Sequence, residues 1–476
     1  MKGFFRKGNF REVLTIALPL VLSNAGHALN LFIDRAMLAG YSDMTMAAAF
    51  PAGLSAFAFS CLFVGTVGYS GAFVAQYYGA KEYDHVGNAV WQGVWVALLG
   101  GAVMWGSSLF AGEIFDFFGH GPEVRELEVI YYRIIAAGTV ANLLCMALSN
   151  FWSGRGRVTM VMTVNLVTTF ANIFLNYLLI FGKKLEIPAV FTLNVPEMGI
   201  RGAAWGTVFA SLLGVLIYGT AFFFFSGSRK YGTLHLFDFP LFKRLLRFGL
   251  PTGVQLAIDL VGFQVFIILQ GKIDSVALAA SGIAFGINSL AFTPLLGIGQ
   301  TVGILVGQSV GSGDIDRGER SVLSARFLGF CYAAVLGGLF FFKPDPLLLA
   351  FGKASPPILS DARLMLKLIA GYLFFDATFL IYSNAIKSAG DTRFSMFAHG
   401  ILAAFTYVIP CLLLFRAYRT KWFQEFFAPS ARGWCLWSVW TISVLYVVIC
   451  GVVFYLRYRQ GKWKKMKVID TPRADS

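Results

Sequence analysis

Long apolar runs dominate the chain, and short polar segments rich in charge separate them. A bilayer core about 30 Å thick needs roughly 20 apolar residues for each helical crossing. Runs of this length occur twelve times, which predicts twelve transmembrane helices. The predicted ranges are Leu14–Leu38, Ala52–Val74, Val90–Phe110, Ile130–Trp152, Met160–Gly182, Ala203–Phe225, Leu250–Leu269, Ile283–Val306, Val322–Phe342, Leu364–Ile386, Met396–Phe415 and Trp434–Leu456.

The composition supports an all-α integral membrane protein. Hydrophobic residues make up 57% of the chain and charged residues only 13%, whereas soluble domains carry about 25% charged residues. The 51 glycines suit helices that pack closely within a membrane. The six cysteines have no CxxC spacing, so we interpret them as small core residues. A soluble enzyme, a disordered chain and a disulfide scaffold are excluded, and we expect no cofactor.

The distribution of basic residues predicts the orientation of the chain. More than half of the 39 lysines and arginines fall in the N-terminal segment, the loops after even-numbered helices and the C-terminal tail. By the positive-inside rule both termini are cytoplasmic, in a multi-pass protein of the inner (plasma) membrane. The net charge of +14 is spread over loops, which favours lipid head groups over nucleic acid as the partner. Met1–Glu12 contains no small-residue cleavage site, so we expect the first helix to be retained.

The two halves of the sequence repeat each other. At an offset of 232 residues, Leu18-Pro19 matches Leu250-Pro251, and the pattern GxxVxQxxG at Gly71–Gly79 matches Gly303–Gly311. Each half holds six predicted helices, so the halves share one orientation and their pseudo-two-fold axis runs along the membrane normal. Such a repeat predicts two six-helix lobes that rock to give alternating access.

The predicted domains are an N-terminal lobe at 1–225, a linker at 226–249, and a C-terminal lobe with a basic tail at 250–476. The linker is amphipathic, with Leu241 and Leu245 on one face and Arg244 and Arg247 on another. We interpret it as an interfacial helix, with a lipid- or partner-sensing switch as the alternative. The prolines of the repeat stand early in equivalent predicted helices, where a helix start is the simplest interpretation and a hinge is the alternative.

Ionisable residues inside membrane helices are costly, which makes them functional candidates. Asp259 lies about 13 Å into its helix from the inner side, and Asp376 lies about 18 Å into its helix from the outer side. In a core about 30 Å thick the two carboxylates fall at one depth in one lobe. We predict that they share a coupling cation, either a proton or a sodium ion. The alternative is two unrelated hydrogen bonds between helices.

A second polar group is predicted in the first lobe. Asp34 lies about 22 Å along the first helix, level with Asn172 and Asn176, which share one face of theirs. These three residues form a candidate site, with a structural hydrogen-bond network or an interfacial pair of Asp34 with its neighbouring arginine as the alternative. His27 and Asn142 are secondary candidates. The repeat places His27 opposite Asp259, although a hydrogen-bonded core histidine is favoured there, as it is for His399.

The chain has neither an HExxH nor a Walker A motif, so neither an enzyme nor an ATP-driven pump is predicted. With these residues assembled, it resembles the multidrug and toxic compound extrusion (MATE) family over nearly its whole length, and most closely the bacterial branch with an acid in the seventh helix. The segments that carry the resemblance are Ala17-Leu-Pro19, Val74–Lys81, Asn172–Gly182, Gly249–Pro251 and Ala385–Arg393, together with the three aspartates.

The resemblance implies an antiporter, expected to be a monomer, that exports organic cations in exchange for sodium ions or protons. Asp259, which stands where the family usually has glutamate, and Asp376 would bind the coupling cation. Asp34, Asn172 and Asn176 match polar positions of the family's first lobe. A lipid-linked oligosaccharide flippase of the wider superfamily is the alternative. Such a flippase usually has additional helices and a cationic cavity, whereas the deep charges here are mainly acidic.

Overall fold

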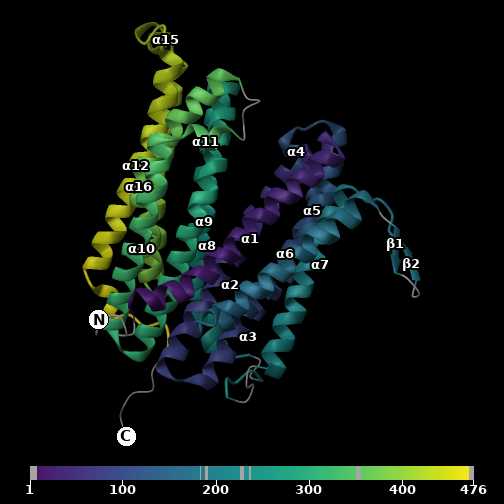
Figure 1. Ribbon diagram of the computed structural model, residues 1–476, viewed down its shortest axis with the longest axis vertical. Coiled ribbons are helices and arrows are strands. Elements are labelled where there is room, and N and C mark those ends of the chain that lie inside the picture. The colour runs from purple at the N-terminus through teal and green to yellow at the C-terminus, as the bar shows by residue number, and fades with distance from the viewer. Residues whose placement is uncertain are drawn as a thin grey trace. The chain divides into compact units, whose positions relative to one another are not determined.

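The computed structural model describes residues 8–182, 184–187, 191–225, 230–234, 237–349 and 355–470. The start of the N-terminal segment, parts of the predicted linker and the last residues of the tail lie outside this part. Within it, twelve helices are long and apolar enough to cross a membrane, as predicted (Figure 1). These are α1 (Phe10–Tyr41), α2 (Asp43–Ala80), α3 (Tyr83–Ser108), α5 (Pro122–Ser153), α6 (Val158–Phe181), α7 (Ile200–Thr220), α8 (Phe239–Ile273), α9 (Ser275–Ser312), α10 (Ile315–Phe342), α12 (Pro356–Ala389), a continuous helix formed by α13 (Thr392–Leu402), the π-helical η4 (Ala403–Val408) and α14 (Ile409–Tyr418), and α16 (Ala431–Arg459).

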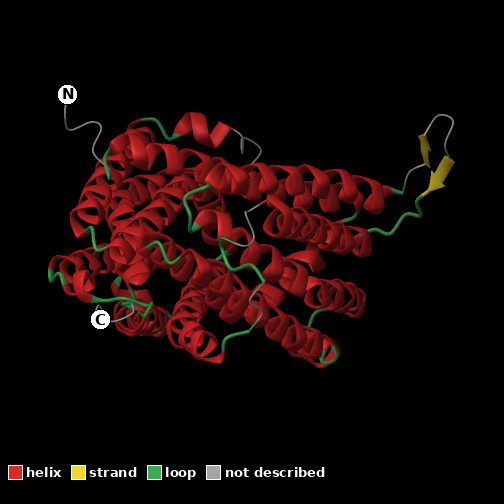
Figure 2. Cartoon of the chain, turned by 90° about the horizontal axis from the view of Figure 1, so that it is seen from below, coloured by secondary structure: helices red, strands yellow, loops and turns green. Residues whose placement is uncertain are grey.

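Shorter elements lie between the long helices or follow the last of them. They are α4 (Ala111–Phe118), α11 (Asp345–Leu348), α15 (Lys421–Phe426), the π-helical η2 (Ala221–Phe225) and the 3-10 helix η5 (Lys462–Lys465). Between α6 and α7, β1 (Lys184–Ile187) and β2 (Phe191–Asn194) pair antiparallel, with Lys184 opposite Asn194. The strands extend beyond the ends of these two helices (Figure 2). The hairpin is an addition to the predicted all-α architecture.

Each of the twelve long helices begins before its predicted range. α8 begins at Phe239, so the amphipathic part of the predicted linker forms its first turns. Pro19 and Pro251 therefore lie inside α1 and α8, and the interpretation of both as helix starts is wrong. The reason is that the polar and basic turns before each apolar run are already helical, although hydropathy alone does not detect them.

The chain forms two compact units. One contains Leu22–Gly253 with Val468–Ser476, and the other contains Met1–Val21 with Val254–Lys467. Both boundaries within helices fall two residues after the repeated prolines. The first turns of α1 thus belong to the unit that holds α9–α16, and the first turns of α8 belong to the unit that holds α2–α7.

Helices at equivalent positions of the repeat have equivalent neighbours in the two units. In one unit α5 packs against α2, α3 and α7, and in the other α12 packs against α9, α10 and α16. Glycine allows the closest of these approaches. A Cβ at Gly138 of α5 would overlap the side chain of Val208 on α7, and one at Gly101 of α3 would overlap Val140 on α5. Small residues at such crossings provide the van der Waals contact that holds membrane helices together.

Candidate functional site

The structure brings together the polar residues predicted for the first lobe. Asn176 of α6 donates a hydrogen bond of 2.7 Å from Nδ2 to Oδ1 of Asp34 on α1. Asn30, one turn before Asp34, donates to Oδ2 at 3.4 Å. Asn176 also donates to Asn172 Oδ1 at 3.1 Å, and both asparagines are buried. The result is an amide-lined carboxylate between α1 and α6, which we call the Asp34 cluster.

Helix α7 completes the Asp34 cluster through two residues that sequence reasoning missed. Thr207 accepts a hydrogen bond of 3.3 Å from Asn172. Gly206 faces Asn176 Oδ1, a fully buried oxygen without a hydrogen-bond partner in the described part of the chain. A Cβ at position 206 would overlap this oxygen. A glycine carries no chemical signature of its own, so only the facing helix reveals its role.

The second polar group lies in the other unit and is built around Asp259 of α8. Its Oδ1 pairs with Nε2 of His399 on α13, and the hydroxyl of Tyr446 on α16 lies 2.9 Å from the same nitrogen. His399 is buried and its ring stacks on that of Phe379, with 5.3 Å between ring centroids. The remaining ring nitrogen, Nδ1, is buried without a partner among the described residues. We call this the Asp259–His399 pair.

His399 is therefore more than a generic core histidine, because it contacts a predicted site residue directly. The two residues are 140 positions apart in the chain, so no spacing rule connects them. The π-helical η4 follows His399 after three residues, and Tyr407 within it stacks on Tyr446 at 5.1 Å between ring centroids. Such π-helical turns inside α-helices are frequent at functional sites.

Asp376 lies on α12 in the same unit as Asp259. Its side chain is buried, and no described residue forms a hydrogen bond or an ion pair with it. The two carboxylates are not joined directly in the described part of the chain. No described group of three or more His, Cys, Asp or Glu side chains could hold a metal ion, so a sodium ion at Asp259 and Asp376 would need further oxygen ligands.

The two secondary candidates lie apart from these contacts. His27 on α1 and Asn142 on α5 have exposed side chains, and no described hydrogen bond joins either of them to the Asp34 cluster. A role for His27 or Asn142 stays a prediction.

Carboxylates and buried amides on membrane-length helices define the class as a multi-pass membrane transporter, since such groups mark ion and substrate pathways. The MatE family profile matches residues 19–178 and 251–413, one stretch in each half of the repeat. The chain belongs to the MatE family of transporters, and it is not an enzyme.

Curated relatives and solved structures agree with this membership. The chain is 29% identical over 415 residues to a probable multidrug resistance protein NorM of Rhizobium meliloti, with 84% of each chain covered. It is 25% identical to the probable NorM of Thermotoga maritima, over 98% of this chain and 95% of the relative. A crystal structure of MATE in complex with MaL6 has the same fold, with a TM-score of 0.80 at 18% identity over 96% of this chain and 97% of that chain.

Proposed function

We propose that this protein is a secondary active antiporter that exports organic cations in exchange for protons or sodium ions, by alternating access of its two lobes. Family membership and the names of the relatives, which describe probable multidrug resistance proteins, support export of drug-like molecules. The named residues supply a separate chemical argument.

The observation that carries the proposal is Asp376. A carboxylate buried in a membrane helix without a donor or a basic partner is costly while it is charged. It is stable when it holds a proton or a cation, which makes it suited to bind and release a coupling ion. Asp259 lies in the same unit and is paired with His399. A coupling ion that reaches Asp259 must therefore compete with His399 for the carboxylate oxygen.

The Asp34 cluster supports a second role, in binding the cargo or a further proton. The carboxylate of Asp34 accepts hydrogen bonds from two amide donors, Asn176 and Asn30. These donors are neutral, so an organic cation would be needed to balance the negative charge. Lipid contact, a monomeric state and cytoplasmic termini remain parts of this proposal. The alternative, a lipid-linked oligosaccharide flippase, is disfavoured because its anionic cargo would meet carboxylates at both groups.

Efflux from proteoliposomes under separately imposed gradients tests the function. Vesicles loaded with the fluorescent organic cation ethidium receive an inward proton gradient, an inward sodium gradient or neither. We expect one of the two gradients to accelerate efflux at least tenfold, and Asp376→Asn to abolish this acceleration. Equal efflux under all three conditions, with the protein folded, would refute the antiporter. Transfer of a polyprenyl-linked oligosaccharide instead would favour the flippase.

A further inference from the structure

The segment that follows α16 is folded onto the protein. After the helix ends at Arg459, Trp463 in η5 is buried, and its ring stacks on Tyr458 at 5.2 Å between centroids. Five residues after Trp463, the chain is buried again at Val468 and Ile469, which are 0% and 3% exposed. A basic tail that served only to fix topology would need neither burial.

Val468 and Ile469 enter the hydrophobic core of the unit that holds α2–α7. They share one cluster of buried side chains with Leu241 and Leu245, which lie in the first turns of α8. The backbone N–H of Val468 donates a hydrogen bond of 3.0 Å to Oε1 of Gln76 on α2, whose side chain is fully buried. This hydrogen bond fixes the position of the segment on α2. Breaking it would leave a buried polar group without this partner, which destabilises the folded protein.

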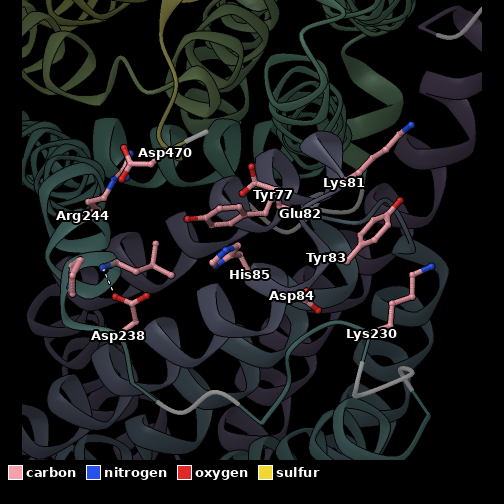
Figure 3. Close-up of a pocket in the computed structure, with 12 residues that line it drawn as sticks. Tyr77, Lys81, Glu82, Tyr83, Asp84, His85, Lys230, Asp238, Arg244 and Asp470 are labelled. Carbon is pink, nitrogen blue, oxygen red and sulfur yellow. Dashed lines mark hydrogen bonds and ion pairs between the residues drawn. The ribbon is translucent and has the colours of Figure 1, made fainter. Parts of the chain in front are cut away.

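Asp470 completes the contact at the surface. Its carboxylate pairs with Arg244, which lies between the two leucines on the first turns of α8. Figure 3 shows the two side chains pointing toward each other at the edge of a cavity of about 750 Å³, which Tyr77, Lys81 and Lys230 also line. Asp470 is 88% exposed, so this ion pair contributes little affinity and mainly fixes the register.

The amphipathic start of α8 thus presents both its faces to the tail. Its apolar face supplies Leu241 and Leu245, and its basic face supplies Arg244. The sequence predicts that this segment is an interfacial helix. In the structure its partner is the tail of the same chain. Eight residues, 460–467, connect the end of α16 to the docked segment, so the length of this connection limits how far the end of α16 can move while the segment stays docked.

We propose that Val468-Ile469-Asp470 is the ligand of an intramolecular binding site formed by α2 and the first turns of α8, and that this docking restrains the transport cycle. A contact that is made in one conformation only stabilises that conformation relative to the others. Release of the tail is then a step of each cycle. The restraint, though not the docking, rests on the proposed transport function.

Thiol labelling tests the docking without any transport assay. The native cysteines are replaced by serine or alanine, and single cysteines are placed at Ile469 or at the exposed Lys467 in otherwise full-length protein. We expect a maleimide to react at least tenfold more slowly with Ile469→Cys than with Lys467→Cys. Val468→Asp, which alters the tail alone, should remove this difference. Equal rates at the two positions, or slow labelling that Val468→Asp leaves unchanged, would overturn the docking site.

Two truncations test the restraint. A chain that ends at Lys467 lacks the docked residues, whereas the matched control that ends at Asp470 retains them. We expect the shorter chain to export ethidium at least twofold faster at saturating concentration, with the control equal to the full chain. Equal or slower export by the shorter chain contradicts the restraint. If the full chain shows no gradient-driven efflux, the proposed function fails instead, and the labelling still decides whether the tail docks.

Discussion

At the scale of single residues, the Asp34 cluster depends on a position that carries no functional group. Gly206 allows α7 to approach Asn176, whose amide holds Asp34. We expect Gly206→Ala to displace that amide and lower export several-fold, with a loss of stability of about 1–3 kcal/mol, typical of overpacking. Gly219→Ala on the same helix has open space around its new methyl group and serves as the control. Wild-type export by Gly206→Ala in the efflux assay would show that the position of the amide is unimportant.

The two carboxylates of the other unit are expected to act together. If Asp259 and Asp376 bind the same coupling ion, either one after the other or together, then Asp259→Asn and Asp376→Asn should each abolish gradient-driven export. The double variant should be hardly worse than either single variant, because groups that act as a unit are non-additive. Cargo binding measured without a gradient should fall much less. Asp259→Glu, which retains the charge, should keep part of the activity. Losses that add up in the double variant argue for two independent roles.

Only some polar residues of the Asp34 cluster and of the Asp259–His399 pair could be predicted from the sequence, and the limit differs between the two groups. Asp34, Asn172 and Asn176 are recognisable because polar groups in apolar helices stand out and helical spacing aligns the two asparagines. His399 was assigned to the core, because nothing local links it to Asp259 on another helix. Only the packing of α8 against α13 brings an imidazole to that carboxylate.

At the scale of elements, hydropathy predicted every membrane-length helix but not where the helices end. The start of α8 shows why, since its basic, amphipathic turns are helical although their mean hydropathy is low. The β1–β2 hairpin was missed because two four-residue strands in a polar loop give a weak pattern. The docked tail was missed because two apolar residues among lysines give no periodic signal.

One ion-pair cluster joins three helices at their ends. Arg432 at the start of α16 pairs with Asp274, the N-cap of α9, and donates a hydrogen bond of 2.9 Å to Asp361 on α12. Partial burial acts to raise the pKa of Asp274, but hydrogen bonds from Arg432 and from the N–H of Ala277 outweigh it and lower the pKa below the ordinary value. Asp274 therefore links the start of α9 to α16 only while it is ionised.

Substitution of Asp274 separates its two contributions. Asp274→Asn keeps a capping side chain and loses the ion pair, whereas Asp274→Ala loses both, and the missing cap costs about 1 kcal/mol more. Since the pKa is lowered in the folded state, the stabilisation is present above the unfolded-state value of about 3.9 and is lost as the pH falls below it. Thermal unfolding in detergent at pH 7 and pH 3 measures this. Equal melting temperatures of the Asn and Ala variants would exclude a capping contribution.

At the scale of the whole molecule, the distribution of charge predicts the orientation of the chain in the membrane. Both termini are expected in the cytoplasm, and the acidic segment around α4 is expected outside. Phe117 on α4 is 89% exposed and Lys467 in the tail is also exposed, so each can carry a single cysteine in a background without native cysteines. A membrane-impermeant maleimide should label Phe117→Cys in intact cells, and Lys467→Cys only after permeabilisation. The reverse pattern would place the basic tail outside. An inward proton or sodium gradient drives the exchanged cargo outward whichever way an antiporter is inserted, so this outcome would refute the predicted orientation, whereas the efflux assay under imposed gradients decides the assignment as an exporter.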